Sequence, residues 1–170
     1  MRKIFIGLVM TLSFVVSANA APNATIFGGY QYTRLGDPTT SVNVDNFFSN
    51  SAIDANGWNA ALTGGFNKWL GVRADVGAAY FSPFHFYTIT FGPEISAPLP
   101  IVRPFAHALF GVAKLSAFGV NSNDFETMIG GGVDLGHGML AWRVAQFDWM
   151  SKALGNKNNF RFSTGLVLRF

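Results

Sequence analysis

Cysteine is absent from the 170 residues of the chain. Disulfide bonds, thiol chemistry and cysteine metal sites are therefore excluded, and the fold must be held by packing and hydrogen bonding. Charged residues are also scarce, at 12% of the chain. No basic patch stands out among them, so the sequence gives no indication of a nucleic-acid partner.

Long apolar runs are missing from residues 21–170, in which no eighteen consecutive apolar residues could cross a membrane as a helix. The N-terminus has a different pattern. A basic start, MRK, precedes the apolar stretch 4–16, which closes on Ala18-Asn19-Ala20. This is typical of a secretory signal peptide cleaved after Ala20. An uncleaved membrane anchor is less favoured, because the stretch is short and ends in small residues.

We therefore expect residues 1–20 to be a signal peptide and residues 21–170 to be a single exported domain. Arg2 and Lys3 are two of the twelve basic residues, so the mature chain would carry ten basic and nine acidic residues and be nearly neutral. The stretch 4–16 should lie apart from the mature fold.

Eight segments of the mature chain alternate with a period of two, which is the pattern of a two-faced strand. Each has at least the ~9–11 residues that a tilted strand needs to cross a bilayer. The segments are 24–35, 57–67, 70–81, 86–96, 102–116, 125–135, 140–150 and 158–170.

The connections between these segments differ in length. Those after the second, fourth and sixth segments are short (NKW, APLP and GHGM), whereas three of the other four are longer, SPFH being the exception. Short turns on one side and longer loops on the other are typical of an outer-membrane barrel. The predicted fold is an all-β, eight-stranded antiparallel up-and-down transmembrane β-barrel.

Alternation alone does not tell which face points inward, because a soluble up-and-down barrel shows the same period. Small residues on the polar face favour a crowded eight-stranded interior. Aromatic residues gather near both ends of the apolar face, as expected for girdles at two membrane interfaces. They are Tyr32, Trp58, Tyr80, Tyr87, Phe125, Trp149 and Phe160 toward the longer loops, and Phe66, Trp142 and Phe170 toward the turns.

Charged residues support the same orientation, since Arg or Lys on the lipid face costs ~2–4 kcal/mol at the midplane. We expect them inside, in a polar network that closes the lumen. A bulge near Val144 or Ala145 is needed to bring Arg143, Gln146 and Asp148 to one face. The expected members are Arg73, Asp75, Glu94, Arg103, His107, Asp134, Arg143, Gln146, Asp148, Arg161 and Arg169.

Two ion pairs are expected in this network from the spacing about the turns. If APLP forms a four-residue turn, Glu94 lies directly opposite Arg103, and the same spacing sets Asp134 opposite Arg143. Glu94 should therefore lie within salt-bridge reach of a lumen arginine, Arg103 first. We further predict that Glu94→Ala raises the conductance of the barrel.

The C-terminal segment NNFRFSTGLVLRF places Phe160, Leu166, Leu168 and Phe170 on its apolar face. With the signal peptide and the eight segments, the ending STGLVLRF resembles the small outer-membrane barrel domain related to outer membrane proteins A and X. This resemblance implies location in the outer membrane of a diderm bacterium. It also implies that the barrel-assembly machinery recognises Phe170 as an insertion signal.

The sequence shows no recognisable catalytic or ligand-binding motif. His85 falls in the connection SPFH, His107 on the lumen face and His137 in a turn, with no nucleophile and acid in a known arrangement beside them. The run Gly130-Gly131-Gly132 lacks the Lys-Ser/Thr of a phosphate loop and indicates a crowded or curved strand. We predict no catalytic residue, no metal site and no cofactor.

The longest connection, 36–57, is the segment expected to be least ordered and to meet an extracellular partner. Phe47 and Phe48 are apolar residues that an outward loop has little structural reason to show. The spacing of its acids, Asp37, Asp45 and Asp54, fits no calcium loop.

The predicted function is structural or surface interaction by an integral outer-membrane barrel with a filled lumen. A narrow channel for ions or small solutes is the alternative. A lipid-modifying enzyme and a soluble periplasmic barrel for an apolar ligand come third and fourth. The expected partners are outer-membrane lipid, the barrel-assembly machinery during insertion and an unknown extracellular molecule.

Overall fold

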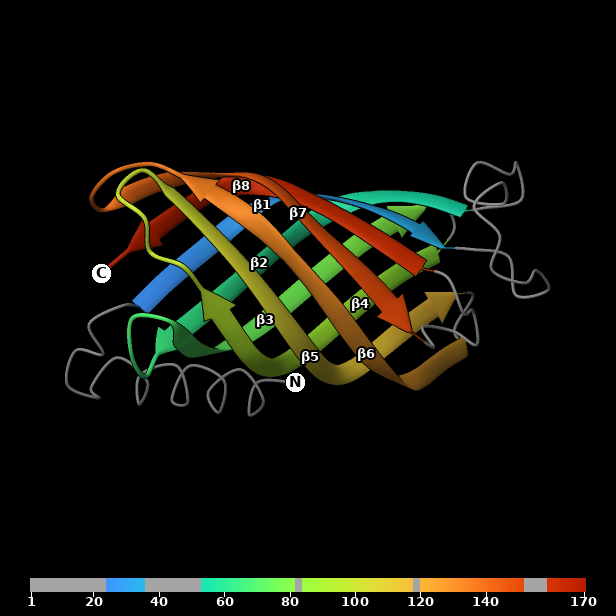
Figure 1. Cartoon of the computed structure of the whole chain (residues 1–170). Coiled ribbons are helices and arrows are strands. Elements are labelled where there is room, and N and C mark those ends of the chain that lie inside the picture. The colour runs from blue at the N-terminus through green and yellow to red at the C-terminus, as the bar shows by residue number, and fades with distance from the viewer. Residues whose placement is uncertain (1–23, 36–52, 82–83, 118–119, 152–158) are drawn as a thin grey trace, which may run out of the picture.

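The computed structural model describes residues 24–35, 53–81, 84–117, 120–151 and 159–170. They form eight antiparallel strands in a closed barrel, each paired with its neighbours in sequence and β1 with β8 (Figure 1). The strands are β1 (Ala24–Leu35), β2 (Ile53–Gly65), β3 (Leu70–Phe81), β4 (Phe84–Ser96), β5 (Val102–Ala117), β6 (Val120–Leu135), β7 (Leu140–Ser151) and β8 (Asn159–Arg169). No helix that could span a membrane occurs in the described part of the chain. The predicted fold is confirmed.

The strands are longer than expected at one end of the barrel. β2 begins four residues before the predicted segment, and β6 begins five residues before it. His85 was expected in the connection SPFH, and this was wrong. It lies in β4 and pairs with Tyr80 of β3, because the ladder continues to the pair Phe81 and Phe84.

Other expectations fall outside the described residues. They concern the stretch 4–16 and cleavage after Ala20, the order of the segment 36–52, and Phe47 and Phe48 within it. Residues 53–57, predicted to belong to that connection, are the beginning of β2.

The two ends of the barrel are distinguished by the chain termini. The expected longer connection FGVNSND was wrong, because β5 and β6 extend through most of it and only residues 118–119 lie between them. The C-terminus, the start of β1 and the three short turns share one end, here called the termini end (Figure 1). Asn67 fixes the turn after β2, because its side-chain oxygen accepts hydrogen bonds from the backbone N–H groups of Trp69 and Leu70, each at 2.8 Å. In the turn after β6, Gly138 has φ +73°, a conformation that favours glycine. The opposite end is called the loop end.

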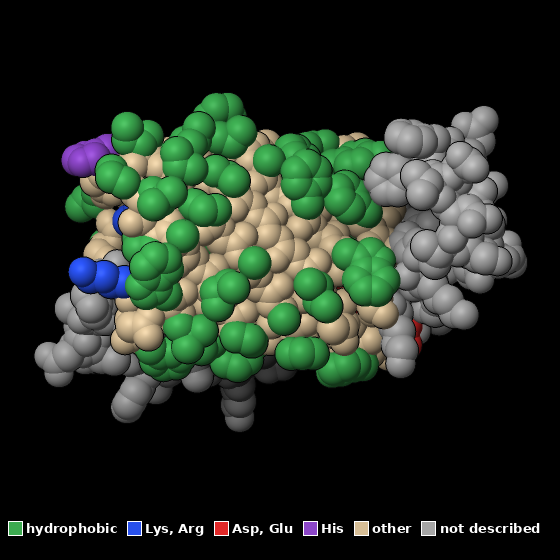
Figure 2. Space-filling model, viewed as in Figure 1, with side chains coloured by type: hydrophobic (Ala, Val, Ile, Leu, Met, Phe, Trp, Pro, Cys, Tyr) green, Lys and Arg blue, Asp and Glu red, His purple; other side chains and the backbone are tan. Residues whose placement is uncertain are grey.

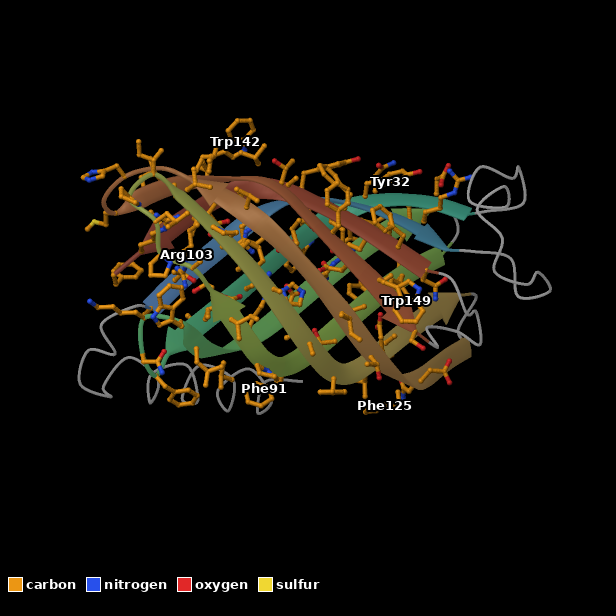
Figure 3. The ribbon with its side chains drawn as sticks, in the orientation of Figure 1. Tyr32, Phe91, Arg103, Phe125, Trp142 and Trp149 are labelled. Atoms are coloured by element: carbon orange, nitrogen blue, oxygen red, sulfur yellow. The ribbon has the colours of Figure 1, made fainter. Side chains whose placement is uncertain are left out.

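Apolar side chains cover the outer surface of the barrel. Ile89 and Phe91 of β4 are 62% and 60% exposed, whereas the intervening Thr90 is buried. Figure 2 shows hydrophobic side chains spread over one whole side of the barrel, with Lys, Arg and His at the termini end. In Figure 3, Trp142 lies on the outer surface toward the termini end, and Tyr32, Phe125 and Trp149 toward the loop end. The inward and outward faces are therefore those predicted from the sequence.

A bulge in β7 corrects the parity of its inward residues. On the β6 side Asp134 pairs with Arg143 and Val133 with Ala145, so Val144 is passed over. On the β8 side the register shifts between Arg143 and Gln146. The bulge lies where the sequence required it, and its effect is to turn both Arg143 and Gln146 into the lumen.

Candidate functional site: the lumen

The centre of the lumen holds a four-membered ionic cluster, composed of Arg73, Asp75, Asp148 and Arg161. Arg161 donates from Nη1 to Asp75 Oδ1 at 2.8 Å and lies 2.7 Å from Asp148 Oδ2 through Nη2. Arg73 Nη2 donates to Asp75 Oδ2 at 2.9 Å. All four side chains are 0% exposed. Each buried charge therefore lies beside a charge of opposite sign, either on another strand or two residues away on the same strand.

Glu94 of β4 joins this cluster on the side of the termini end. Its Oε2 accepts from Arg73 Nη1 at 3.1 Å and from the hydroxyl of Thr63 at 3.2 Å, and Arg103 Nη2 lies 3.9 Å from Oε1. The expectation that Glu94 lies within salt-bridge reach of a lumen arginine is confirmed. Arg73, however, is nearer than Arg103.

The expected pairing of Glu94 directly opposite Arg103 was wrong. Glu94 pairs with His107 instead, a shift of four residues. The backbone N–H of Ala97 bonds to Pro104 O at 2.9 Å, so the turn is wider than APLP and the first residues of β5 pair only with β6. Prolines at positions 98, 100 and 104 lack the N–H that a tighter ladder would require.

Arg143 forms a bridge between opposite walls of the barrel. Its guanidinium carbon lies 4.3 Å from the ring centroid of Phe27 and 4.2 Å from that of Phe105. Phe27 is on β1 and Phe105 on β5, four strands apart in a closed ring of eight. The guanidinium also donates to Asp134 at 2.7 Å, which is the pair predicted from the spacing. Cation–π stacking and an ion pair together hold this layer across the lumen.

Gln146 ties the arginine layers to the acidic groups. Its Oε1 accepts from Arg73 at 3.0 Å and from Arg143 at 2.7 Å, while its Nε2 donates to Asp148 at 2.7 Å. The contact with Arg73 links β7 to β3, which is again the opposite wall. His107 Nε2 lies 2.8 Å from Asp148 Oδ1. We call the predicted network members the ionic section; they are Arg73, Asp75, Glu94, Arg103, His107, Asp134, Arg143, Gln146, Asp148, Arg161 and Arg169.

Arg103 and Arg169 occupy the mouth of the lumen at the termini end. Arg103 donates to the hydroxyl of Ser96 at 2.9 Å, and Arg169 lies 3.9 Å from Asp134 and donates to Gly136 O at 3.4 Å. Their side chains are partly exposed, unlike those of the central cluster. Figure 3 places Arg103 at this end of the barrel. The two arginines therefore form the outer layer of the ionic section.

Two glycines make room for the ionic section. A Cβ on Gly130 would lie 2.1 Å from Asp148 Oδ1, and one on Gly77 would lie 2.7 Å from Gln31 Oε1. A Cβ on Gly130 would also lie 2.4 Å from the backbone oxygen of Phe147, so no side chain fits there, whereas one on Gly77 would displace the polar side chains around it. The crowded strand inferred from Gly130-Gly131-Gly132 is thereby confirmed.

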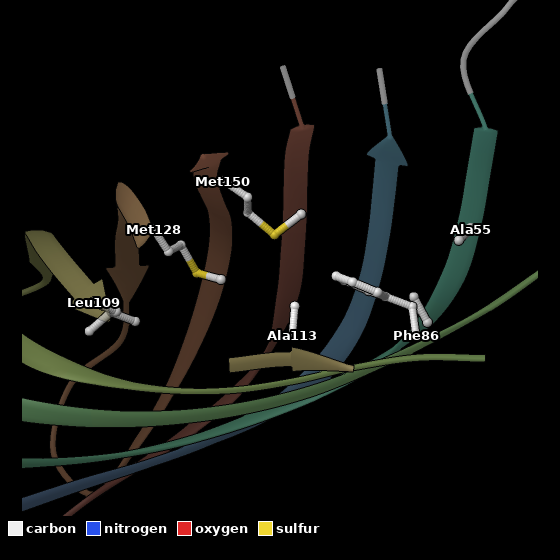
Figure 4. Close-up of a cluster of buried hydrophobic side chains, with 7 residues drawn as sticks. Ala55, Phe86, Leu109, Ala113, Met128 and Met150 are labelled. Carbon is white, nitrogen blue, oxygen red and sulfur yellow. The ribbon is translucent and has the colours of Figure 1, made fainter. Parts of the chain in front are cut away.

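An apolar layer lies between the ionic section and the loop end. Figure 4 shows its side chains converging from several strands. Met128 connects the layers, because its sulfur lies 3.1 Å from Arg161 Nη2. We call this set the apolar section; it consists of Ala55, Ala79, Phe86, Leu109, Ala113, Met128 and Met150.

Glu126 is a lumen residue that the sequence analysis missed. It is 0% exposed, two residues from Met128 on the inward face of β6, and neither carboxylate oxygen has a hydrogen-bond partner in the described structure. The signal was available, because Glu126 has the same parity as Asp134. Phe27, Thr63 and Phe105 were missed as well. They are inward residues whose apolar or neutral character drew no attention.

The chemistry open to this lumen is limited. No group of three or more possible metal ligands occurs among the described residues. His107 uses Nε2 for Asp148, and its Nδ1 has no hydrogen-bond partner there, so no described hydroxyl is activated by this histidine. His85 faces outward, and His137 is exposed in the turn after β6. The geometry instead provides closure, with side chains from opposite walls meeting at several levels.

Comparison with known proteins bears on the fold. No protein-family model and no curated protein matches the chain. Ail, the attachment invasion locus protein of Yersinia pestis, solved in complex with the heparin analogue sucrose octasulfate, is 20% identical with a TM-score of 0.55; the match covers 87% of this chain and 98% of Ail. For Neisserial surface protein A the values are 14%, 0.65, 89% and 98%. For the outer membrane enzyme PagL they are 14%, 0.50, 84% and 98%. At these identities the likeness shows a shared barrel fold.

Proposed function

We propose that this chain is an integral outer-membrane β-barrel of a diderm bacterium, related to the small barrels of outer membrane proteins A and X. Its role is structural or surface interaction, with a lumen that is closed to free conduction. One observation carries the proposal: the polarity of the barrel is inverted. The largest fully buried side chains are led by three arginines, whereas large apolar side chains are exposed on all sides.

A bilayer explains this inversion and water does not. Phe91, Ile95 and Phe110 are each about half exposed or more, and every one of the eight strands carries exposed large apolar side chains. Soluble monomers rarely expose so many apolar side chains around the whole molecule. Closure of the barrel leaves no strand edge unpaired in the hydrocarbon. The fourth alternative, a soluble barrel with an apolar ligand, would need the apolar face inside.

The closed lumen distinguishes our proposal from the channel alternative. The ionic section is held by bonds between β3 and β7 and by the Arg143 stack between β1 and β5. An eight-stranded interior has little more room than its side chains occupy. A channel would require several of these bonds to break together.

Among the structural relatives, PagL is an enzyme and Ail binds a sulfated sugar analogue, so the fold supports more than one role. We propose that this chain is not an enzyme, because His107 is committed to Asp148 in the closed lumen. Comparing lipid A mass spectra from cells with and without the protein tests this directly. A modified lipid A that depends on the protein would establish the enzyme alternative.

We also propose the route and partners of the protein. Export would remove residues 1–20, and Phe170 at the end of β8 would serve as the insertion signal for the barrel-assembly machinery. An extracellular partner would meet the segment 36–57. Deleting Phe170 should lower the amount of folded barrel in the outer membrane, as measured by heat-modifiable gel mobility of membrane fractions.

The experiment that tests membrane integration is refolding into phospholipid vesicles. The proposal expects a gel band that shifts on boiling and resists extraction by urea. A chain that folds in buffer without lipid or detergent would overturn it.

A further inference from the structure

The outer surface at the loop end is not uniform around the barrel. All four tyrosines of the chain lie on the outward face of β1, β3 and β4, near the loop end. The arc formed by β6, β7 and β8 has Phe and Trp at this level and no tyrosine; its outward rings are Phe125, Phe147, Trp149, Phe160 and Phe162. The tyrosine hydroxyl groups are thus concentrated on one arc of the rim.

Four side chains gather on this arc, on β3, β4 and β5; we call them the rim cluster. Tyr80 lies 5.5 Å from His85 and 6.4 Å from Tyr87 between ring centroids, with both contacts edge-to-face. Lys114 is exposed and stands directly opposite Tyr87 in the ladder. Cross-strand partners lie close enough for their side chains to act on one ligand.

The donor groups of the rim cluster remain available to a ligand, because the hydrogen bonds and ion pairs nearby do not use them. Trp58 donates its indole N–H to the hydroxyl of Tyr80 at 3.4 Å, so the hydroxyl hydrogen of Tyr80 can point elsewhere. Among the described residues, Asp54 is the acid on the outward face. It lies on β2, where it accepts from Tyr32 at 2.8 Å and is 3.9 Å from Arg34. Lys114 has no ion pair with a described acid.

We propose that the rim cluster binds the phosphomonoester headgroup of a membrane lipid in the leaflet at the loop end. Lys114 supplies a cation on a long apolar stem that reaches the headgroup level, while Tyr80, Tyr87 and His85 supply O–H and N–H donors. The exposed Ile89 and Val112, nearer the barrel centre, contact the acyl chains. This inference rests on the proposed membrane location.

Charge complementarity decides in favour of a phosphate over a neutral headgroup. A lysine on the lipid face near an interface costs only ~0–1 kcal/mol, and hydrogen bonds to a doubly charged oxyanion are stronger than those to neutral groups. A phosphomonoester can accept from Lys114 and a tyrosine at once. A phosphodiester offers fewer free oxygens and less charge.

The test is native mass spectrometry of the refolded full chain in detergent, titrated with dioctanoyl phosphatidic acid or dioctanoyl phosphatidylglycerol. We expect phosphatidic acid to bind more tightly and Lys114→Gln to weaken it about ten-fold. Tyr80→Phe and Tyr87→Phe should each weaken it about two- to three-fold, and Lys114→Arg should retain it.

The matched control is Lys68→Gln, which removes an exposed lysine at the termini end. An equal loss of affinity for phosphatidic acid in Lys114→Gln and Lys68→Gln would overturn the site, because it would show a general attraction of the lipid to basic residues. Phosphatidylglycerol binding as tightly as phosphatidic acid, or inorganic phosphate competing at equal concentration, would also overturn it. Heat-modifiable mobility of each variant reports membrane folding separately, so a failure here is distinguishable from failure of the proposed function.

Discussion

The two sections of the lumen place charge under opposite conditions. In the ionic section, Asp75 and Asp148 are each contacted by arginines and are fully buried. Beside the apolar section, two residues from Met128, Glu126 is equally buried and has no hydrogen-bond partner in the described structure. Burial costs each carboxylate its hydration, and only the ionic section returns that cost through partners. The ionic section therefore satisfies its buried carboxylates with hydrogen bonds and ion pairs, whereas the carboxylate beside the apolar section has no hydrogen bond in the described structure.

The largest effect should follow from removing one cation of the ionic section. Arg161→Met leaves Asp75 and Asp148 without their shared partner, and we expect a loss of about 3–5 kcal/mol in the free energy of unfolding. Urea unfolding in phospholipid vesicles, followed by tryptophan fluorescence, measures it. Lys68→Gln in the exposed turn should stay within about 0.5 kcal/mol. Equal stability of the two variants would show that the ionic section does not hold the barrel together.

A smaller loss is expected in the apolar section. Leu109→Ala removes a fully buried side chain beside Met128, and we expect a loss of about 2–3 kcal/mol by the same measurement. Met128→Leu conserves volume and should cost less than about 1.5 kcal/mol. If Leu109→Ala costs nothing, this section is loosely packed and contributes little to the fold.

The sharpest contrast comes from one substitution made in both sections. Glu126→Gln removes a buried charge that has no hydrogen-bond partner in the described structure and should stabilise the barrel by about 1 kcal/mol at neutral pH. Glu94→Gln weakens bonds with Arg73 and Thr63 and should destabilise it by a similar amount. If the urea midpoints of both variants move in the same direction, the two carboxylates do not differ in their contribution to stability as we propose.

From the sequence, the side of the strand on which a residue lies is easier to predict than the side chain that it contacts. Alternation placed Arg73, Asp75, Arg161 and the other network members inside, because one polar residue on the wrong face would meet lipid. The turn between β6 and β7 was short enough to count across, so the pair of Asp134 and Arg143 could be derived. These predictions use only the neighbouring strand.

Contacts across the lumen could not be predicted by counting residues about a turn, because they join strands that are not neighbours. The stack of Arg143 on Phe27 and Phe105 joins β7 to strands that are not its neighbours, and no spacing in the sequence encodes it. Glu94 was assigned a partner from an assumed four-residue turn, and prolines widened that turn. The wider turn places His107 rather than Arg103 opposite Glu94, so Arg103 lies 3.9 Å from Glu94 while Arg73 of β3 lies 3.1 Å from it.

Planar-bilayer conductance of the refolded barrel tests the closed lumen most directly. We expect no steady unit conductance from the unmodified protein. Glu94→Ala, which frees Arg73 and Arg103 from their shared carboxylate, should produce openings. Glu126→Gln, which removes no bond of the ionic section, should remain silent. Steady conductance by the unmodified barrel would contradict closure and establish the channel.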